Sequence, residues 1–348
     1  MRTIQCLSFA AALLAVPAVL ATTATAQPTT QWHVVKSLPI GGVGGMDYLT
    51  VDPATHLLYV PRTTHTLVID SASGKVVADI PGQKNAHGVA LAPKSGRGFI
   101  SDGGGSGAVT IFDLKTNATL GTLTAVPDTD GIAYDDFTGL ILSVAGDSGV
   151  LMTIDPAIDP KSGKIETPIQ LGGAPEFFAS DGAGKVFINL EDKNEVVAVD
   201  LKARKVIARW PVAPGGAPVG MSIDRAKHQI FIGCRKPQKM IVMSTDTGKV
   251  LADLPIGMGV DATVTHKGQS LASCGDGTLA IIAETAPGKF TTVQTLKTAL
   301  GAKTMGLDLS TNTLYMPTAE FGPPKPGATR GAAIPGSFKI VVVAPDAK

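Results

Sequence analysis

Residues 44–82, GGMDYLTVDPATHLLYVPRTTHTLVIDSASGKVVADIPG, decide the fold of this chain. Four short apolar runs alternate here with turn-forming residues and predict β-strands at about 46–51, 57–61, 66–70 and 76–80. Hairpin turns join such strands into a four-stranded antiparallel sheet. A sheet of this size has two apolar faces, and it can bury both of them only against neighbouring sheets.

The same pattern recurs along the chain at intervals of 40 to 46 residues. The first residue of the first turn marks each unit: Asp52, Ala92, Asp135, Asp181, Asp224, His266 and Asp308. Four strands repeated about every 42 residues predict an all-β fold of the β-propeller type, and seven markers predict seven blades. The last unit has three predicted strands, so we expect the N-terminal strand at 32–40 to complete it and close the ring.

Three stretches carry a family resemblance: LYVPRTTHTLVIDSASGKVVADIPG (58–82), KVFINLEDKNEVVAVDLKARKVIARWPV (185–212) and QIFIGCRKPQKMIVMSTDTGKVLADLPIG (229–257). They resemble the repeat of the YVTN-repeat, YncE-like seven-bladed propellers, which have a WD40-like architecture, and the resemblance covers residues 31–346. It implies the fold and carries no catalytic motif. The family includes surface proteins and suspected nucleic-acid binders, so single-stranded DNA binding is one alternative that it implies. Pro61-Arg62 stands where the family has Thr-Asn.

The N-terminus has the composition of a secretory signal. Arg2 precedes an apolar run at 7–20, and Ala-Thr-Ala precedes Gln27. We therefore expect a signal peptide at 1–26 and a single exported domain at 27–348, which is periplasmic or secreted and monomeric. The formal net charge is +1 and aromatic residues make up 5% of the chain, which disfavours nucleic acid as a partner.

Cys234 and Cys274 occupy nearly the same place in neighbouring repeats. Two alternatives are open for them. An oxidising compartment allows a disulfide, whereas an apolar propeller interior favours two buried free thiols. The sequence around them lacks the spacing of zinc ligands.

Ionisable residues recur five positions before the turn markers, at the start of each predicted innermost strand. Val219 is the exception, and the ionisable positions are Asp47, His87, Asp130, Glu176, Asp261 and Lys303. The next residues are mostly apolar or small, so we expect these six side chains to form a charged ring at one mouth of the central channel. Such a ring is either a solvated rim or a ligand-binding site, and a concave convergence of charges favours the second.

Oxygen-rich side chains near this mouth suit a hard cation, with Ca²⁺ or another divalent metal as the cofactor. The metal-ligand candidates are Glu176, Asp130, Asn194, Asp261 and Asp276. By analogy with propeller lactonases, a metal-dependent hydrolase or lyase with His87 as catalytic acid or base is one hypothesis. Because no complete catalytic motif is present, we favour a non-catalytic module that binds a small molecule or a protein.

A proline- and glycine-rich insertion at 318–336 lengthens the last repeat. It carries Glu320, Phe321, Lys325 and Arg330. Long loops in an economical repeat are often functional, so the insertion is either a lid over the channel or a structural elaboration of the ring closure.

Overall fold

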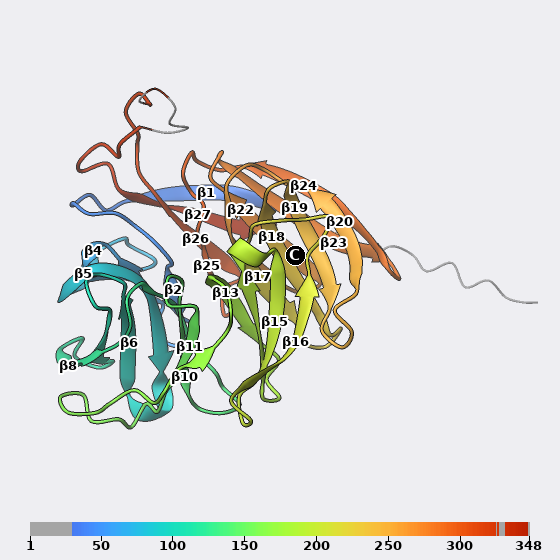
Figure 1. Ribbon diagram of the computed structural model, residues 1–348. Helices are drawn as coiled ribbons and strands as arrows, with labels where there is room; N and C mark the ends of the chain where they lie inside the picture. The colour runs from blue at the N-terminus through green and yellow to red at the C-terminus, as the bar shows by residue number, and fades with distance from the viewer. Residues whose placement is uncertain (1–29, 325, 327–330, 347–348) are drawn as a thin grey trace, which may run out of the picture.

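The computed structural model describes residues 30–324, 326 and 331–346, and within them the protein is an all-β propeller (Figure 1). Two short 3₁₀ turns, η1 (Pro93–Ser95) and η2 (Glu191–Lys193), interrupt the strands. Among the described residues, no helix has the length and apolar character needed to cross a membrane. The signal segment expected at 1–26 lies outside the described residues.

Five sheets in the described part of the chain have four antiparallel strands each, which confirms the predicted blade. In pairing order they are β9 (Thr129–Tyr134), β10 (Ile141–Ala145), β11 (Val150–Ile154) and β12 (Ile169–Gln170); β13 (Pro175–Ser180), β14 (Lys185–Leu190), β15 (Glu195–Asp200) and β16 (Lys205–Pro211); β17 (Pro218–Asp224), β18 (Gln229–Arg235), β19 (Gln238–Ser244) and β20 (Val250–Pro255); β21 (Val260–His266), β22 (Gln269–Cys274), β23 (Thr278–Ala286) and β24 (Lys289–Lys297); and β25 (Gly306–Asp308), β26 (Thr313–Thr318), β27 (Lys339–Pro345) and β1 (Trp32–Pro39).

The remaining described strands form one seven-stranded sheet rather than two separate ones. Its strands are β2 (Thr50–Asp52), β3 (Leu57–Pro61), β4 (Thr63–Asp70), β5 (Val76–Ala92), β6 (Arg97–Asp102), β7 (Ala108–Asp113) and β8 (Thr119–Thr124). In the long strand β5, Ile80 pairs with Thr66 of β4, whereas Val89 pairs with Ile100 of β6. The sequence predicted a strand end near residue 80. The strand continues because Pro81 and Ala86 still pair with His65 and Thr63 of β4, across an irregularity in the register.

The two ends of the described chain meet in one sheet. The N-terminal strand β1 pairs antiparallel with β27, from Trp32 opposite Pro345 to Pro39 opposite Lys339. Figure 1 shows this blue strand beside the red C-terminal strands. The predicted closure by the N-terminal strand is confirmed, and β1 occupies the position of the outermost strand that the last repeat lacks.

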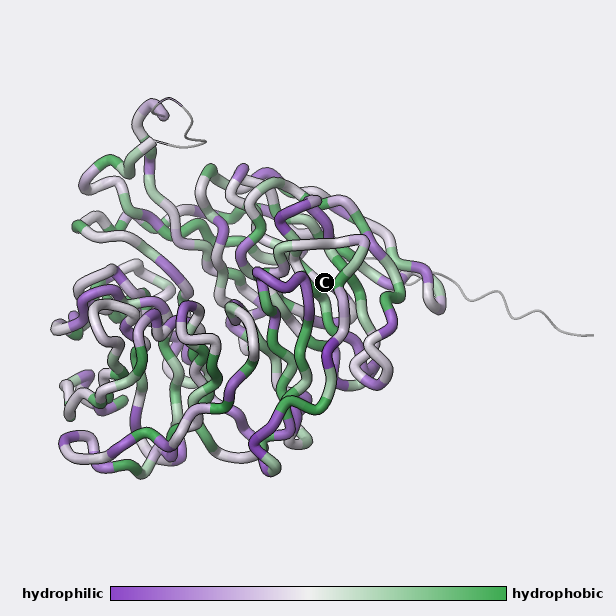
Figure 2. Tube along the Cα trace, viewed as in Figure 1, coloured by the Kyte–Doolittle hydropathy of each residue, from purple (hydrophilic) through white to green (hydrophobic). Residues whose placement is uncertain are grey.

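Alternation along each strand sends side chains into two different layers of core. On β3, Leu58 packs with Ile340 on one side of the sheet, while Tyr59 on the other side lies with its ring centroid 5.5 Å from that of Phe112. Figure 2 shows apolar residues distributed along the strands of the neighbouring sheets. Both faces of the strand are therefore buried, as the two apolar faces in the sequence require.

Candidate functional site

A β-bulge opens the innermost strand of several sheets, at the position of the ionisable residues. Two consecutive residues there face a single residue of the second strand: His87 and Gly88 in β5, Asp130 and Gly131 in β9, Glu176 and Phe177 in β13, and Val219 and Gly220 in β17. A bulge leaves a residue unpaired and redirects its side chain. At Gly220 an added Cβ would lie 3.0 Å from the carbonyl carbon of Ala262 on the next innermost strand, so these strands approach too closely for a larger residue.

Asp47, His87 and Asp130 form one group, which we call the acid–histidine cluster. The Nδ1 atom of His87 lies 2.7 Å from Oδ2 of Asp47 and 3.5 Å from Oδ1 of Asp130. The side chains of these three residues are 24%, 15% and 25% exposed, respectively. The cluster therefore joins residues at or before the starts of three innermost strands, and its side chains stay partly accessible to solvent.

Asn85 holds the imidazole of His87 from the other side. Its Nδ2 atom lies 2.8 Å from Nε2 of His87. Both ring nitrogens of His87 thus have a partner, and the orientation of the ring is fixed by groups on either side.

The surroundings of the cluster raise the pKa values of His87 and Asp130. Burial would lower the pKa of His87, but the hydrogen bond to Asp47 and the charge of Asp130 raise it to about 9. Burial raises the pKa of Asp130 to about 7, against the opposing effect of His87 and with the help of Asp47. Asp130 therefore keeps its proton to a higher pH than an ordinary aspartate, because burial outweighs the positive charge of His87.

Asp261, Arg235 and Lys303 form a second group beside the first, which we call the basic pair on Asp261. The Asp261 side chain is 4% exposed and contacts both the Arg235 guanidinium and, at 2.7 Å, the Lys303 ammonium. Arg235 also donates to the carbonyl of Val260 at 3.1 Å and lies 3.4 Å from Glu191. This buried carboxylate has two close basic partners, whereas Asp130 has, among the described residues, only the 3.5 Å contact with His87.

Charges of both groups affect the pKa of Glu176. Burial, followed by the charges of Asp130 and Glu191, raises the pKa of Glu176 to about 8, although Arg235 opposes the shift. Burial would lower the pKa of Arg235, but Asp261 and the two glutamates raise it. The mouth therefore contains more carboxylates than its basic side chains neutralise.

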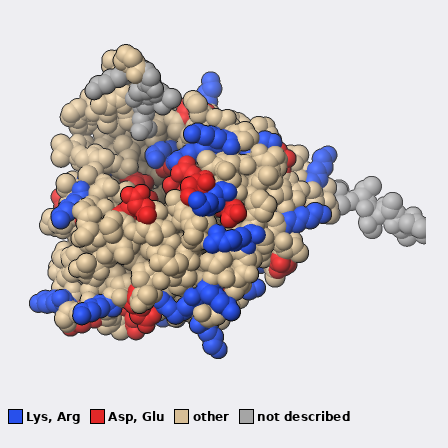
Figure 3. Space-filling model, viewed as in Figure 1, with Lys and Arg blue, Asp and Glu red and all other residues tan. Residues whose placement is uncertain are grey.

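An aromatic pair lies among these charges. The rings of Tyr48 and Phe177 are 4.9 Å apart between centroids and tilted by 57°. Burial, followed by the charges of Asp261 and Asp130, raises the pKa of Tyr48 well above its ordinary value. Carboxylates of both groups therefore raise the pKa of Tyr48, and its ring supplies an apolar surface next to them. On the face seen in Figure 3, acidic and basic side chains gather around a hollow near the middle.

The predicted metal ligands do not form one set. Asp130 lies with Asp47 and His87, and these three are a group of ligand atoms within 4.8 Å of one another. The Asn194 side-chain oxygen accepts a 2.7 Å hydrogen bond from the backbone of Ala217. Asp276 accepts one of the same length from the backbone of Met258. Asn194 and Asp276 therefore support loops, while Asp261 is held by Arg235 and Lys303.

The sequence analysis missed several residues of the mouth. Arg235, Glu191 and Asn85 each contact the predicted residues or shift their pKa values. Arg235 and Glu191 lie at or just after the end of a second strand, whereas Asn85 lies within β5, two residues before His87. A second column, directly after the second strand of each repeat, contains Arg62, Glu191 and nearby Arg235. Comparing this column between repeats would have located Arg235 and Glu191.

The two cysteines are free thiols in the structure. Cys234 and Cys274 are both buried, and they pack in two different core clusters. Burial raises the pKa of each thiol to about 12. The structure thus has the buried thiols and lacks the disulfide alternative.

The insertion at 318–336 is described in part. Phe321 pairs with Ala333, and the backbone of Ile334 donates to Glu320 at 2.8 Å, so the base of the loop is a short ladder. Lys325 and Arg330 lie outside the described residues. The lid role stays a prediction.

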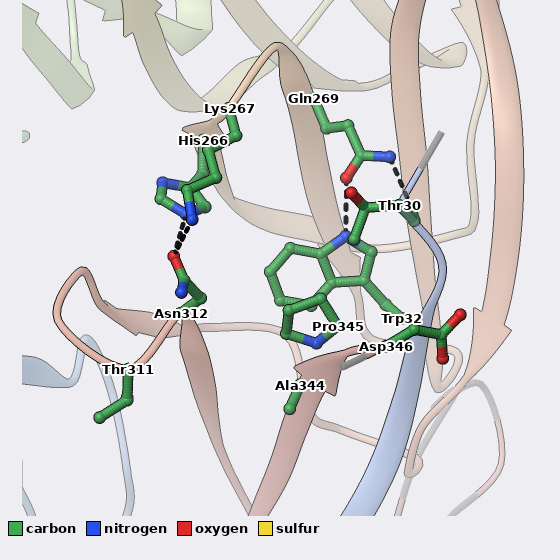
Figure 4. Close-up of a pocket in the computed structure, with 10 residues that line it drawn as sticks. All are labelled: Thr30, Trp32, His266, Lys267, Gln269, Thr311, Asn312, Ala344, Pro345 and Asp346. Carbon is green, nitrogen blue, oxygen red and sulfur yellow. Dashed lines mark hydrogen bonds between the residues drawn. The ribbon is translucent and has the colours of Figure 1, made fainter. Parts of the chain in front are cut away.

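A pocket of about 300 Å³ lies away from the mouth (Figure 4). His266 and Lys267, at the far end of β21 from Asp261, line it and both contact Oδ1 of Asn312 at 2.7 Å. The indole of Trp32 lines the other side and donates to Gln269 at 2.8 Å. The polar side chains named here are therefore hydrogen-bonded to one another, and they connect strand ends next to β1.

Comparison with known proteins agrees with this architecture. No family model matches the chain. A stretch of 160 residues is 24% identical to the uncharacterized protein YncE of Escherichia coli O157:H7, covering 42% of this chain and 44% of that protein, so the chain spans less than half the length of this curated relative. A chain in the crystal structure of a mitotic checkpoint complex superimposes with a TM-score of 0.72 over 98% of both chains at 12% identity, which supports the fold alone. The chain is a β-propeller with distant homology to YncE.

Proposed function

We propose that this protein binds a small ligand with a positively charged group at the channel mouth. One observation carries the proposal: Oδ1 of Asp130 is buried and accepts no hydrogen bond among the described residues, in a mouth where acids outnumber bases. A bound cation supplies the positive charge that is missing around Asp130 and Glu176. The Tyr48–Phe177 pair adds aromatic faces, which attract cations.

Thermal melting with a panel of organic cations such as arginine, choline and spermidine tests this proposal. Ligands that bind the folded state raise the melting temperature. We expect at least one to do so for the wild-type protein and much less for Glu176→Gln. Glu166→Gln, which changes an exposed acid outside the mouth, is the matched control. No shift with any cation, or an equal shift in Glu176→Gln, would contradict the proposal.

A second candidate is metal-assisted hydrolysis of a lactone or ester. It is favoured by His87, which is held on both ring nitrogens like an oriented acid or base. We expect turnover above background to disappear in His87→Gln. Background rates for the wild-type protein on a broad lactone and ester panel would leave the binding function alone. Single-stranded DNA is disfavoured as a ligand because its phosphates would meet the acids of the mouth.

We also propose that the seven-stranded sheet is two blades, which share strand β5, so that the propeller has seven blades. The first half of β5 completes one four-stranded unit with β2, β3 and β4, and its second half begins another with β6, β7 and β8. An experimental structure with another number of blades would contradict this count.

The proposed cellular location rests on the sequence of residues 1–26. We propose export to the periplasm or the medium as a monomer, after removal of residues 1–26. N-terminal sequencing of the exported protein is expected to begin at Gln27, and gel filtration is expected to give one chain. A protein that keeps its N-terminus and remains in the cytoplasm would contradict the proposal.

A further inference from the structure

The acid–histidine cluster has the spacing of a metal site. Its three ligand atoms come from three neighbouring innermost strands or their approaches and lie within 4.8 Å of one another. Ligands on one metal ion at about 2.1 Å lie roughly 3 Å apart. The distances from Nδ1 of His87 to the oxygens of Asp47 and Asp130, 2.7 and 3.5 Å, bracket that value. Small side-chain rotations would place all three atoms on one ion.

The second observation is the unsatisfied oxygen of Asp130. Its Oδ1 atom is buried and has no hydrogen-bond partner among the described residues. A buried acceptor without a donor is costly, and native structures retain such groups mostly where they serve a purpose. The turn acids differ from it: Asp308, for example, accepts hydrogen bonds from Ser310 at 2.6 and 2.8 Å.

Asn85 completes the arrangement around His87. Histidine ligands use one nitrogen for the metal and give the other N–H to a polar neighbour, which fixes the tautomer. Asn85 lies 2.8 Å from Nε2, and rotation of its amide group places the oxygen there to accept this N–H. Nδ1 is then free to face Asp47 and Asp130 as a ligand.

We infer that Asp47, His87 and Asp130 bind a divalent first-row transition metal ion of the Zn²⁺ or Mn²⁺ kind. An imidazole with two carboxylates favours these ions over Ca²⁺, which prefers oxygen ligands throughout. The three side chains are 15 to 25% exposed, so the ion faces the mouth and leaves coordination positions for a ligand. This inference rests on the proposed binding function and names the ligand class for one part of the same site.

The test measures metal uptake by the mature protein after chelation and dialysis. Calorimetric titration with Mn²⁺, Zn²⁺ and Ca²⁺, with elemental analysis of the products, is expected to give about one Mn²⁺ or Zn²⁺ per chain. We expect His87→Gln and Asp130→Asn to weaken binding by more than about 100-fold and Asn85→Ala by roughly 10-fold. Electron paramagnetic resonance of Mn²⁺ gives a second readout, since bound and free ions differ in spectrum.

His56→Gln is the matched control, because His56 forms a similar pair with Asp308 at 3.0 Å outside the mouth. It is expected to leave uptake unchanged. Circular dichroism identifies any variant that fails to fold, and Asp47→Asn then takes its place. No uptake by the wild-type protein, uptake unchanged in His87→Gln and Asp130→Asn, or preferential Ca²⁺ binding would overturn the inference. If organic cations still raise the melting temperature of the chelated protein, the proposed function stands without the metal. If the wild-type protein takes up no metal and no organic cation raises its melting temperature, both the inference and the proposed function are wrong.

Discussion

Two carboxyl groups of the same chemical type have opposite environments in this propeller. Asp308 lies at a turn after an innermost strand, and its buried side chain accepts hydrogen bonds from Ser310 and contacts His56 at 3.0 Å. Although burial would raise its pKa, these partners lower it to about 2. Asp130, at the other end of an innermost strand, has a buried oxygen without a hydrogen bond and a pKa raised to about 7.

The difference distinguishes the turn position of the repeat from the position at the start of the innermost strand. Turn acids are surrounded by donors of their own turn, so they stabilise the fold. Asp130 and Glu176, in contrast, come from different strands, and burial outweighs the positive charge near them. The surrounding sheets, rather than donors of their own turn, hold these two acids in place.

Removal of the turn acid has the largest expected effect. Asp308→Ala leaves the donors of Ser310 and His56 without an acceptor and is expected to lower the free energy of unfolding by about 3 kcal/mol. Urea denaturation measures the change. Asp346→Ala, which removes an exposed acid paired with His33, is the control and should change stability by less than about 0.5 kcal/mol. Equal effects for the two variants would break the comparison.

Arg235→Met comes next in size. The buried Asp261 then keeps only Lys303 as its ionic partner, and we expect the free energy of unfolding to fall by about 2 kcal/mol. Arg209→Met removes a more exposed arginine that pairs with Glu195 at 3.4 Å, and it serves as the control in the same urea experiment. If Arg235→Met proves neutral, the basic pair on Asp261 does not support the mouth.

Glu176→Gln is expected to have a smaller effect, of opposite sign. The pKa of Glu176 is raised to about 8 in the folded protein, above its ordinary value of 4.5, so the native state holds the proton more tightly than the unfolded state. Stability from this group is therefore lost as pH rises from 4.5 through 8. Above pH 8 the variant should be more stable than the wild-type protein, by on the order of 1 kcal/mol.

Thermal melting between pH 5 and pH 9 measures this effect, and Glu166→Gln is the exposed control. A wild-type curve parallel to that of Glu176→Gln would show that Glu176 titrates normally.

The thiols provide the smallest perturbation. Because burial raises the pKa of Cys234 and Cys274 to about 12, iodoacetamide is expected to leave both unmodified in the native protein at pH 8. Mass spectrometry after unfolding in urea without reductant should show two labels on the mature chain. Absence of labels after unfolding would indicate a disulfide instead.

Much of the fold was predictable from local patterns. The repeat near residues 44–82 predicts the hairpins, because alternation and turn residues act over a few positions. The N-terminal closure followed from the missing strand of the last repeat. The continuity of β5 was not predictable in this way, since it depends on pairing between residues 63 and 86 rather than on a local turn signal.

The site was predictable as a column but not as a set of contacts. Counting five residues back from each turn located Asp47, His87 and Asp130, because the repeat fixes their position along the strand. Their grouping apart from Asp261 depends on which blades are neighbours and on Arg235, a residue of another strand. Such pairing is a property of three-dimensional packing, and one sequence does not contain it.

The most direct test of the account is a carbon-detected NMR titration of the carboxyl groups in the mature protein. We predict that Asp308 titrates near pH 2, while Asp130 and Glu176 titrate near pH 7 and 8. That result would show that burial and neighbouring acids outweigh the positive charge near Asp130 and Glu176, which a bound cation would then supply. Ordinary values near 4 for both Asp130 and Glu176 would contradict the central claim.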